Sequence, residues 1–164
     1  MKLMMIISLL FFSFCTSADM VNRSSNGGSI VCFGDSLVRL DEYVLVHHPK
    51  MVIVTLGVND ALQEMSKAET LKNIRIIIDR IQAGGAMVVW TDVRTGERED
   101  VYLKEFRSMA SQKGVLLIED VLRDIATHQE YMPDIWHPNA KGYALMAERI
   151  YQEIKVSFSD CCLK

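Results

Sequence analysis

The chain has 164 residues, of which 49% are hydrophobic and 24% charged, and its formal net charge is −3. These values are ordinary for a globular protein with room for one domain and a buried core. The weak acidity, together with the absence of any Lys/Arg cluster with interleaved aromatic residues, argues against nucleic acid as a partner. We therefore expect a small-molecule substrate.

The N-terminus carries one lysine, Lys2, followed by an apolar run too short to span a bilayer comfortably. Small residues end this run and suit a cleavage site, so residues 1–18 are predicted to be a signal peptide and the mature chain to begin near Asp19. The alternative is a lipoprotein anchored through Cys15, which is disfavoured because the bulky Phe14 precedes it. The sequence thus predicts a periplasmic or secreted protein.

The remaining chain is predicted to form one domain over residues 29–158, after a flexible Ser/Asn/Gly-rich lead-in at 19–28 and before a tail at 159–164. Three cysteines follow the predicted signal peptide, too few for a disulfide framework. We assign no chemistry to them, and expect the first to be a small buried hydrophobe: Cys32, Cys161 and Cys162.

Strand and helix patterns alternate along this domain. Continuous apolar, β-branched runs predict four strands covered on both faces, as in a parallel sheet: 30–33, 51–56, 87–90 and 115–118. The clearest helix pattern follows a capping box from Ser66 to Glu69 and ends at the glycines 84–85. Further helices are predicted at about 101–113 and from about Asn139. This order predicts a doubly wound α/β fold.

Three polar segments fall where open α/β sheets build their sites, after a predicted strand or in the last loop. The first is Gly-Asp-Ser-Leu at 34–37. Ser36 there can stand at the head of the next helix, whose N-terminus favours negative charge. The tetrapeptide alone is equally compatible with a serine that only caps that helix.

The second segment is Gly-Val-Asn-Asp at 57–60. Gly57 lets the backbone turn tightly, and Asn59 on such a turn can aim its side-chain amide at a developing oxyanion. Because Gly, Asn and Asp also form ordinary turns, this segment is a weak signal by itself.

The third segment places Asp134 and His137 three residues apart before the last helix. On one turn the carboxylate can hydrogen-bond to the imidazole, fix its tautomer and stabilise the imidazolium that forms when the histidine takes a serine proton. Alone, a surface turn with a Pro-led helix start is the better interpretation. A nucleophile, an oxyanion donor and an acid–base pair in this chain order together favour a serine hydrolase.

The three segments resemble the conserved blocks of the SGNH hydrolases, also called GDSL esterases and lipases. Four further residues extend the match: Pro138, Asn139, Gly142 and Tyr143. From residue 49 to about residue 154 the chain is most similar to the bacterial arylesterase, thioesterase I and lysophospholipase branch. The resemblance implies a three-layer α/β/α sandwich with a parallel sheet. It also implies hydrolysis of carboxylic esters or thioesters through an acyl-enzyme, without cofactor or metal, and with membrane lipids met only as substrates.

In the scheme that the resemblance implies, Ser36 attacks, His137 serves as general base and then general acid, and Asp134 orients the imidazole. The amide of Ser36 and the side chain of Asn59 bind the oxyanion. Three neighbours support or cap the site: Asp35, Gly57 and Asp60. The other histidines have no motif around them and are expected at the surface: His47, His48 and His128.

One block of the family is missing from this chain. Members usually carry, between the nucleophile and the Gly-x-Asn-Asp segment, a glycine whose amide is a further oxyanion donor. Here no glycine lies between Leu37 and Leu56. We therefore expect a sheet shortened to about four strands, with 30–33 as an apolar edge strand that invites pairing with a second chain. The main alternative to an active esterase is a degenerate, weakly active or non-catalytic relative. A nucleotide-binding domain is disfavoured, since no Gly-rich phosphate loop follows any predicted strand.

Overall fold

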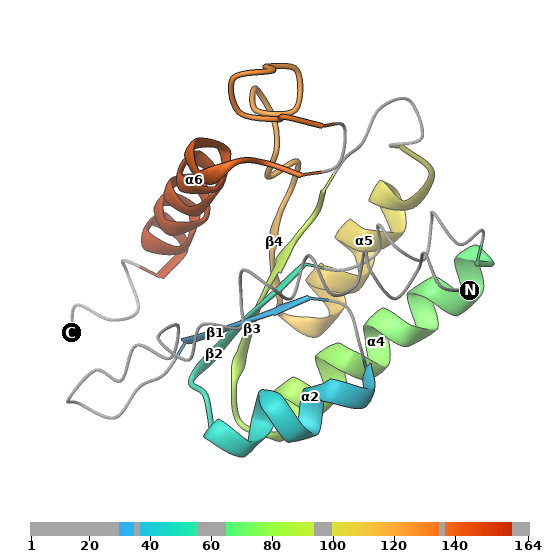
Figure 1. The fold of residues 1–164 in the computed structure, drawn as a ribbon. Coiled ribbons are helices and arrows are strands. Elements are labelled where there is room, and N and C mark those ends of the chain that lie inside the picture. Colours follow the sequence, from blue (N-terminus) through green and yellow to red (C-terminus); the bar gives the residue numbers. More distant parts are fainter. Residues whose placement is uncertain (1–29, 35–36, 56–64, 94–99, 135–136, 159–164) are drawn as a thin grey trace. The chain divides into compact units, whose positions relative to one another are not determined.

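The computed structural model describes residues 30–34, 37–55, 65–93, 100–134 and 137–158. Its strands follow the order β1-β2-β3-β4 in one sheet. Strands and helices alternate along the chain (Figure 1): β1 (Ile30–Gly34), α2 (Leu37–Tyr43), the 3-10 helix η2 (Leu45–His47), β2 (Met51–Thr55), α4 (Lys67–Ala83), β3 (Met87–Thr91), α5 (Asp100–Lys113), β4 (Leu116–Ile118) and α6 (Ala140–Phe158). This is the predicted α/β fold with a parallel sheet of four strands.

The contacts of the chain divide it into two compact units, residues 1–90 and 91–164. The division falls inside β3, whose last residue, Thr91, belongs to the second unit. Among the described residues no helix is both long and apolar enough to cross a membrane. The predicted limits of the domain, at 29 and 158, stay a prediction.

In the first unit, β1 and β2 run parallel, with Ile30 opposite Met51 and Gly34 opposite Thr55. A parallel pair needs a crossover connection, and here the short helices α2 and η2 supply it. Leu40 of α2 is fully buried. The sheet order places β1 at one end, the position that the sequence predicted for it.

Helix α4 shows why its sequence forms a helix. Ser66 caps its N-terminus, because the Ser66 hydroxyl oxygen accepts from the amide of Glu69 at 3.2 Å while the hydroxyl donates to the Glu69 carboxylate at 3.2 Å. The chain leaves the helix at Gly84 and Gly85, the second with φ of 80°. Residues spaced at three and four positions form the buried stripe: Ile74, Ile77, Ile78 and Ile81.

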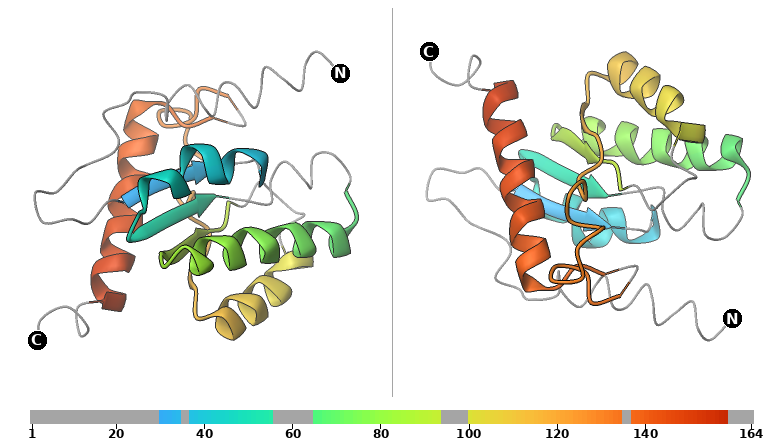
Figure 2. Two further views of the ribbon diagram at one scale, coloured as in Figure 1. Left: turned by 90° about the horizontal axis from the view of Figure 1, so that it is seen from below. Right: turned by 90° about the horizontal axis from the view of Figure 1, so that it is seen from above.

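In the second unit, the backbone after β3 continues to pair with the region of β4. The amide of Asp92 donates to the carbonyl of Ile118 at 2.9 Å, and the amide of Val121 donates to the carbonyl of Asp92 at 2.9 Å. Helices α5 and α6 both contact β4 and lie on either side of it (Figures 1 and 2). After β4 the chain forms a buried cluster: Val121, Leu122, Ile125 and Met132.

Candidate active site

The structure describes the acid–base half of the predicted site. Asp134 and His137 lie in the loop before α6, and the ring Nδ1 of His137 is 3.1 Å from each carboxylate oxygen of Asp134. The main-chain amide of His137 donates to Oδ1 of the same carboxylate at 2.8 Å. The remaining predicted residues lie outside the described residues: Asp35, Ser36, Gly57, Asn59 and Asp60.

This geometry suits general base catalysis. An Nδ1–H that donates to the Asp134 carboxylate makes Nε2 the basic nitrogen of the neutral His137 ring. The side chain of His137 is 26% exposed and that of Asp134 is 52% exposed. Burial therefore confines this pair only in part.

Asn139 ties this turn to the preceding loop. Its Oδ1 accepts from the amides of Lys141 at 3.0 Å and Gly142 at 3.1 Å, which caps the N-terminus of α6. Its Nδ2 donates to the carbonyl of Glu130 at 2.6 Å, and its own amide donates to the carbonyl of Tyr131 at 2.7 Å. Asn139 is one of the residues that extend the resemblance to the family. Its hydrogen bonds explain why an asparagine suits this position.

Gly142 lies where α6 approaches that loop closely. A Cβ atom at this position would be 2.7 Å from the carbonyl oxygen of Tyr131 and 2.8 Å from Cβ of Pro138. Both distances are shorter than real Cβ contacts, so the approach requires glycine. The close approach keeps the first turn of α6 against the loop that carries the acid–base pair.

Tyr143, in the first turn of α6, is near enough to Asp134 to sense the charge of its carboxylate. Burial raises the pKa of the Tyr143 phenol above its ordinary value, and the negative charge of Asp134 raises it further. On the outer surface, Lys141 and Glu130 form an exposed ion pair at 2.8 Å, which raises the pKa of Lys141 and lowers that of Glu130.

The three remaining histidines are exposed, as predicted: His47, His48 and His128. Sequence analysis did not single out Arg149, whose guanidinium binds main-chain carbonyls of the loop after β4. No motif marks such a residue, because its partners are backbone atoms.

A parallel α/β fold with an Asp–His pair in the loop before its last helix is compatible with a hydrolase that uses a histidine base. Comparison with known proteins shows the family. The model of the GDSL-like lipase/acylhydrolase family matches residues 16–145. The chain belongs to this family and is an esterase, as the sequence predicted.

Individual relatives are similar over most of the chain. An arylesterase of Vibrio mimicus is 29% identical over 140 residues, which cover 82% of this chain and 68% of the relative. The thioesterase 1/protease 1/lysophospholipase L1 of Escherichia coli strain K12 is 23% identical over 146 residues, which cover 85% of this chain and 69% of the relative. The similarity therefore extends to more than one kind of ester hydrolase.

Solved structures share the fold. The psychrotrophic esterase EstA from Pseudoalteromonas sp., in a structure inhibited by monoethylphosphonate, has a TM-score of 0.66 and 24% identity, covering 74% of this chain and 70% of that chain. The crystal structure of TesA has a TM-score of 0.62 and 25% identity, covering 73% of this chain and 69% of that chain.

Proposed function

We propose that this esterase cleaves carboxylic esters or thioesters through an acyl-enzyme formed on Ser36. The observation that carries the proposal is the hydrogen-bonded pair Asp134 and His137. The Ser36 oxygen attacks the acyl carbonyl while its proton passes to Nε2 of His137, and the Asp134 carboxylate stabilises the imidazolium. The protonated ring then gives that proton to the leaving alcohol or thiol.

The second half of the reaction uses the same ring. His137 removes a proton from water as the water attacks the acyl-enzyme, and it returns the proton to the Ser36 oxygen when the acid leaves. The Ser36 amide and the Asn59 side chain bind the oxyanion in both halves. This mechanism requires no metal and no cofactor.

The similarity to an arylesterase and to a thioesterase/lysophospholipase supports small acyl esters and thioesters as the substrate class. Membrane lipids enter only as substrates. Rates across acyl chain length for aryl esters, acyl-CoA and lysophospholipid measure the preference directly.

Turnover should be slow, because loss of one preorganised oxyanion donor costs on the order of 10²–10³ in kcat. A fluorophosphonate probe, which needs only the activated serine, should label the wild type and not Ser36→Ala. Hydrolysis of a short-chain p-nitrophenyl ester should disappear in the same variant. If the probe fails to label the wild type, the protein is a degenerate member of its family; if Ser36→Ala keeps full activity, the nucleophile is wrong.

Export is the second part of the proposal, supported by the Lys2-led apolar run and the small residues that end it. N-terminal sequencing of periplasmic or secreted material should begin near Asp19. Recovery of cytosolic protein with Met1 intact would refute export.

The end position of β1 in the sheet order supports a third part, pairing of β1 with β1 of a second copy. Sedimentation of the purified protein should show a dimer. A monomer at all concentrations tested would exclude this pairing.

A further inference from the structure

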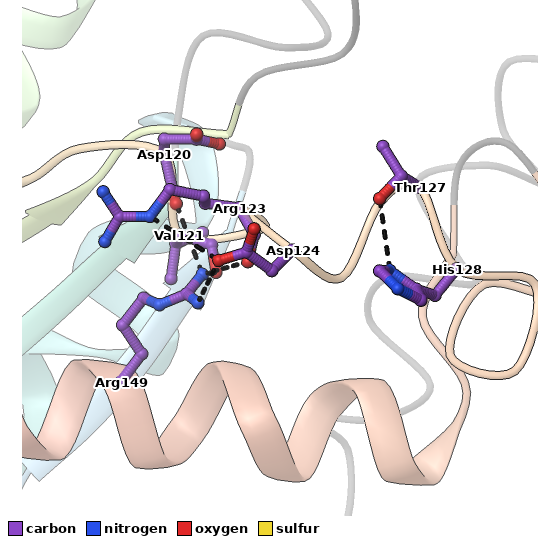
Figure 3. A network of polar contacts seen from close by, with 7 residues as sticks. All are labelled: Asp120, Val121, Arg123, Asp124, Thr127, His128 and Arg149. Carbon is purple, nitrogen blue, oxygen red and sulfur yellow. Dashed lines mark hydrogen bonds and ion pairs between the residues drawn. The ribbon is translucent and has the colours of Figure 1, made fainter.

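The side chain of Arg149, on α6, reaches the loop that follows β4 (Figure 3). Its Nη1 donates to the carbonyl oxygens of Val121 at 2.9 Å and Arg123 at 2.7 Å, and lies 3.5 Å from that of Asp120. The Arg149 side chain is only 22% exposed. A single guanidinium therefore gathers three main-chain oxygens of one loop, and we name this set of contacts the Arg149 clamp.

The loop backbone is shaped to present these oxygens. Asp120 and Asp124 have φ of 48° and 64°, in the left-handed region that most residues avoid. The Asp124 carboxylate adds a weaker ionic contact, 3.9 Å from Nη2 of Arg149. Hydrogen bonds to a charged donor are stronger than neutral ones, so the clamp offsets the cost of this conformation.

A series of main-chain hydrogen bonds runs from Leu122, within the clamped loop, to Asn139, two residues after His137. The carbonyl of Leu122 accepts from the amides of Ile125 and Ala126, the carbonyl of Ile125 accepts from His128, and the carbonyl of His128 accepts from Tyr131. The carbonyl of Tyr131 then accepts from the amide of Asn139, the residue that caps α6. The turn with Asp134 and His137 lies between these last two residues.

Packing couples the same parts. Met146 and Ile150, which flank Arg149 on α6, pack against the buried cluster that includes Val121 and Ile125. Helix α6 is thus fixed to the loop at two places, by the clamp and by the Asn139 cap. Asp134 and His137 lie in the stretch of chain just before Asn139. Because Asp134 and His137 are partly exposed, their own burial fixes them only in part.

We propose that Arg149 is a positioning residue for the acid–base pair: through the clamp it holds the loop after β4, and through that loop it fixes the orientation of His137. The expected change in kcat rests on the proposed function, whereas the expected change in the orientation of the His137 ring does not. Displacing a catalytic group by about 1 Å can cost about 10²-fold in rate.

The experiment compares Arg149→Met, which removes the guanidinium, with Arg149→Lys, which keeps the charge but lacks the planar fork that spans several acceptors. The matched control is Arg123→Met, because the Arg123 side chain is 64% exposed and its ion pair with Asp124 is long, at 3.9 Å. For each variant we would measure kcat and KM for a p-nitrophenyl ester, the thermal midpoint, and the NMR signal and solvent exchange of the His137 Nδ1 proton.

We expect Arg149→Met to lower kcat by about 10 to 10²-fold with KM little changed, and to speed exchange of the His137 ring proton. Arg149→Lys should be intermediate, and Arg123→Met should match the wild type. If Arg149→Met lowers only the thermal midpoint, leaving kcat and the ring proton unchanged, the positioning role is wrong. Should Arg149→Met fail to fold, Arg149→Lys decides by the same criteria. Should the wild type lack turnover, the proposed function fails, and the ring proton still tests Arg149.

Discussion

The carboxylate of Asp134 binds the main chain and the ring of His137 at once: Oδ1 is 2.8 Å from the His137 amide nitrogen, and both oxygens are 3.1 Å from its Nδ1. One side chain therefore has two separable tasks. It accepts a hydrogen bond from the main chain of His137, and in the proposed mechanism it selects the ring tautomer that leaves Nε2 basic.

Substitution of Asp134 should separate these tasks. In Asp134→Asn the amide oxygen still accepts from the His137 main chain, but the substituted side chain carries no charge to stabilise an imidazolium. We expect kcat to fall on the order of 10⁴-fold with little change in thermal midpoint, whereas Asp134→Ala should also lower the midpoint. Steady-state kinetics and thermal unfolding measure the two effects. His137→Ala should lose more activity than Asp134→Asn; the reverse order would contradict the assigned roles.

Replacing the cap residue Asn139 should affect both stability and rate. Asn139→Ala removes the cap of α6 and the 2.6 Å bond to the Glu130 carbonyl, so the free energy of unfolding should drop by about 1–3 kcal/mol. Denaturant unfolding measures the loss. Ser66→Ala is the matched control, because it removes the cap of α4 and should cost about 1 kcal/mol without changing kcat. If Asn139→Ala and Ser66→Ala change kcat by the same factor, Asn139 has no special role at the site.

A single added methyl group at Gly142 should be strongly unfavourable. In Gly142→Ala the new Cβ would meet the Tyr131 carbonyl at 2.7 Å, so α6 or the loop must move, at a cost of about 1–3 kcal/mol. Gly84→Ala is the control: its φ is −74° and its nearest contact would be 3.3 Å, so we expect a change within about 1 kcal/mol. The denaturant midpoints of the two variants measure these costs. If Gly142→Ala has the midpoint of the wild type, the close approach does not require glycine.

Tyr143 should make stability depend on alkaline pH. Its pKa is raised in the folded protein, by burial first and by Asp134 second, so folding favours the neutral phenol. The resulting stability is fully present below the unfolded pKa, near 10.0, and is lost as the pH rises through the higher folded pKa. Denaturant midpoints of the wild type should fall across this window more steeply than those of Tyr143→Phe.

A second variant tests the cause. Asp134→Asn removes the charge that opposes ionisation of Tyr143, so the pKa of Tyr143 should move down toward its ordinary value. Ultraviolet titration of the phenolate, with Tyr143→Phe subtracted, reports this pKa. If Asp134→Asn leaves it where it is in the wild type, Asp134 does not act on Tyr143.

Local chemistry explains what the sequence could predict. Helix α4 was predicted with its start and its end, because Ser66 and Glu69 interact across one turn and Gly85 supplies a positive φ that ends it. The strands of the sheet were predicted within a residue or two at the ends that the structure describes, since their apolar runs are continuous. The sequence analysis predicted β1 at the end of the sheet because it found no counterpart of one family block, and the sheet order has β1 at one end.

Contacts between distant segments could not be predicted in this way. Arg149 is a cation on an amphipathic helix with no motif around it. Its partners are main-chain carbonyls 26 to 29 residues earlier in the chain. The need for glycine at position 142 depends on where the Tyr131 carbonyl lies in space. Asp134 and His137, in contrast, could be predicted to pair because they are only three positions apart in the sequence.

The same difference in sequence separation bears on how this region folds. Bringing together Asp134 and His137 closes a very short loop, while the contact of Arg149 with Val121 closes one 28 residues long. The entropy lost on closing a loop rises with its length, so the short closure is the less costly. During refolding we therefore expect the acid–base pair to assemble early and to be anchored late, when α6 reaches the loop after β4.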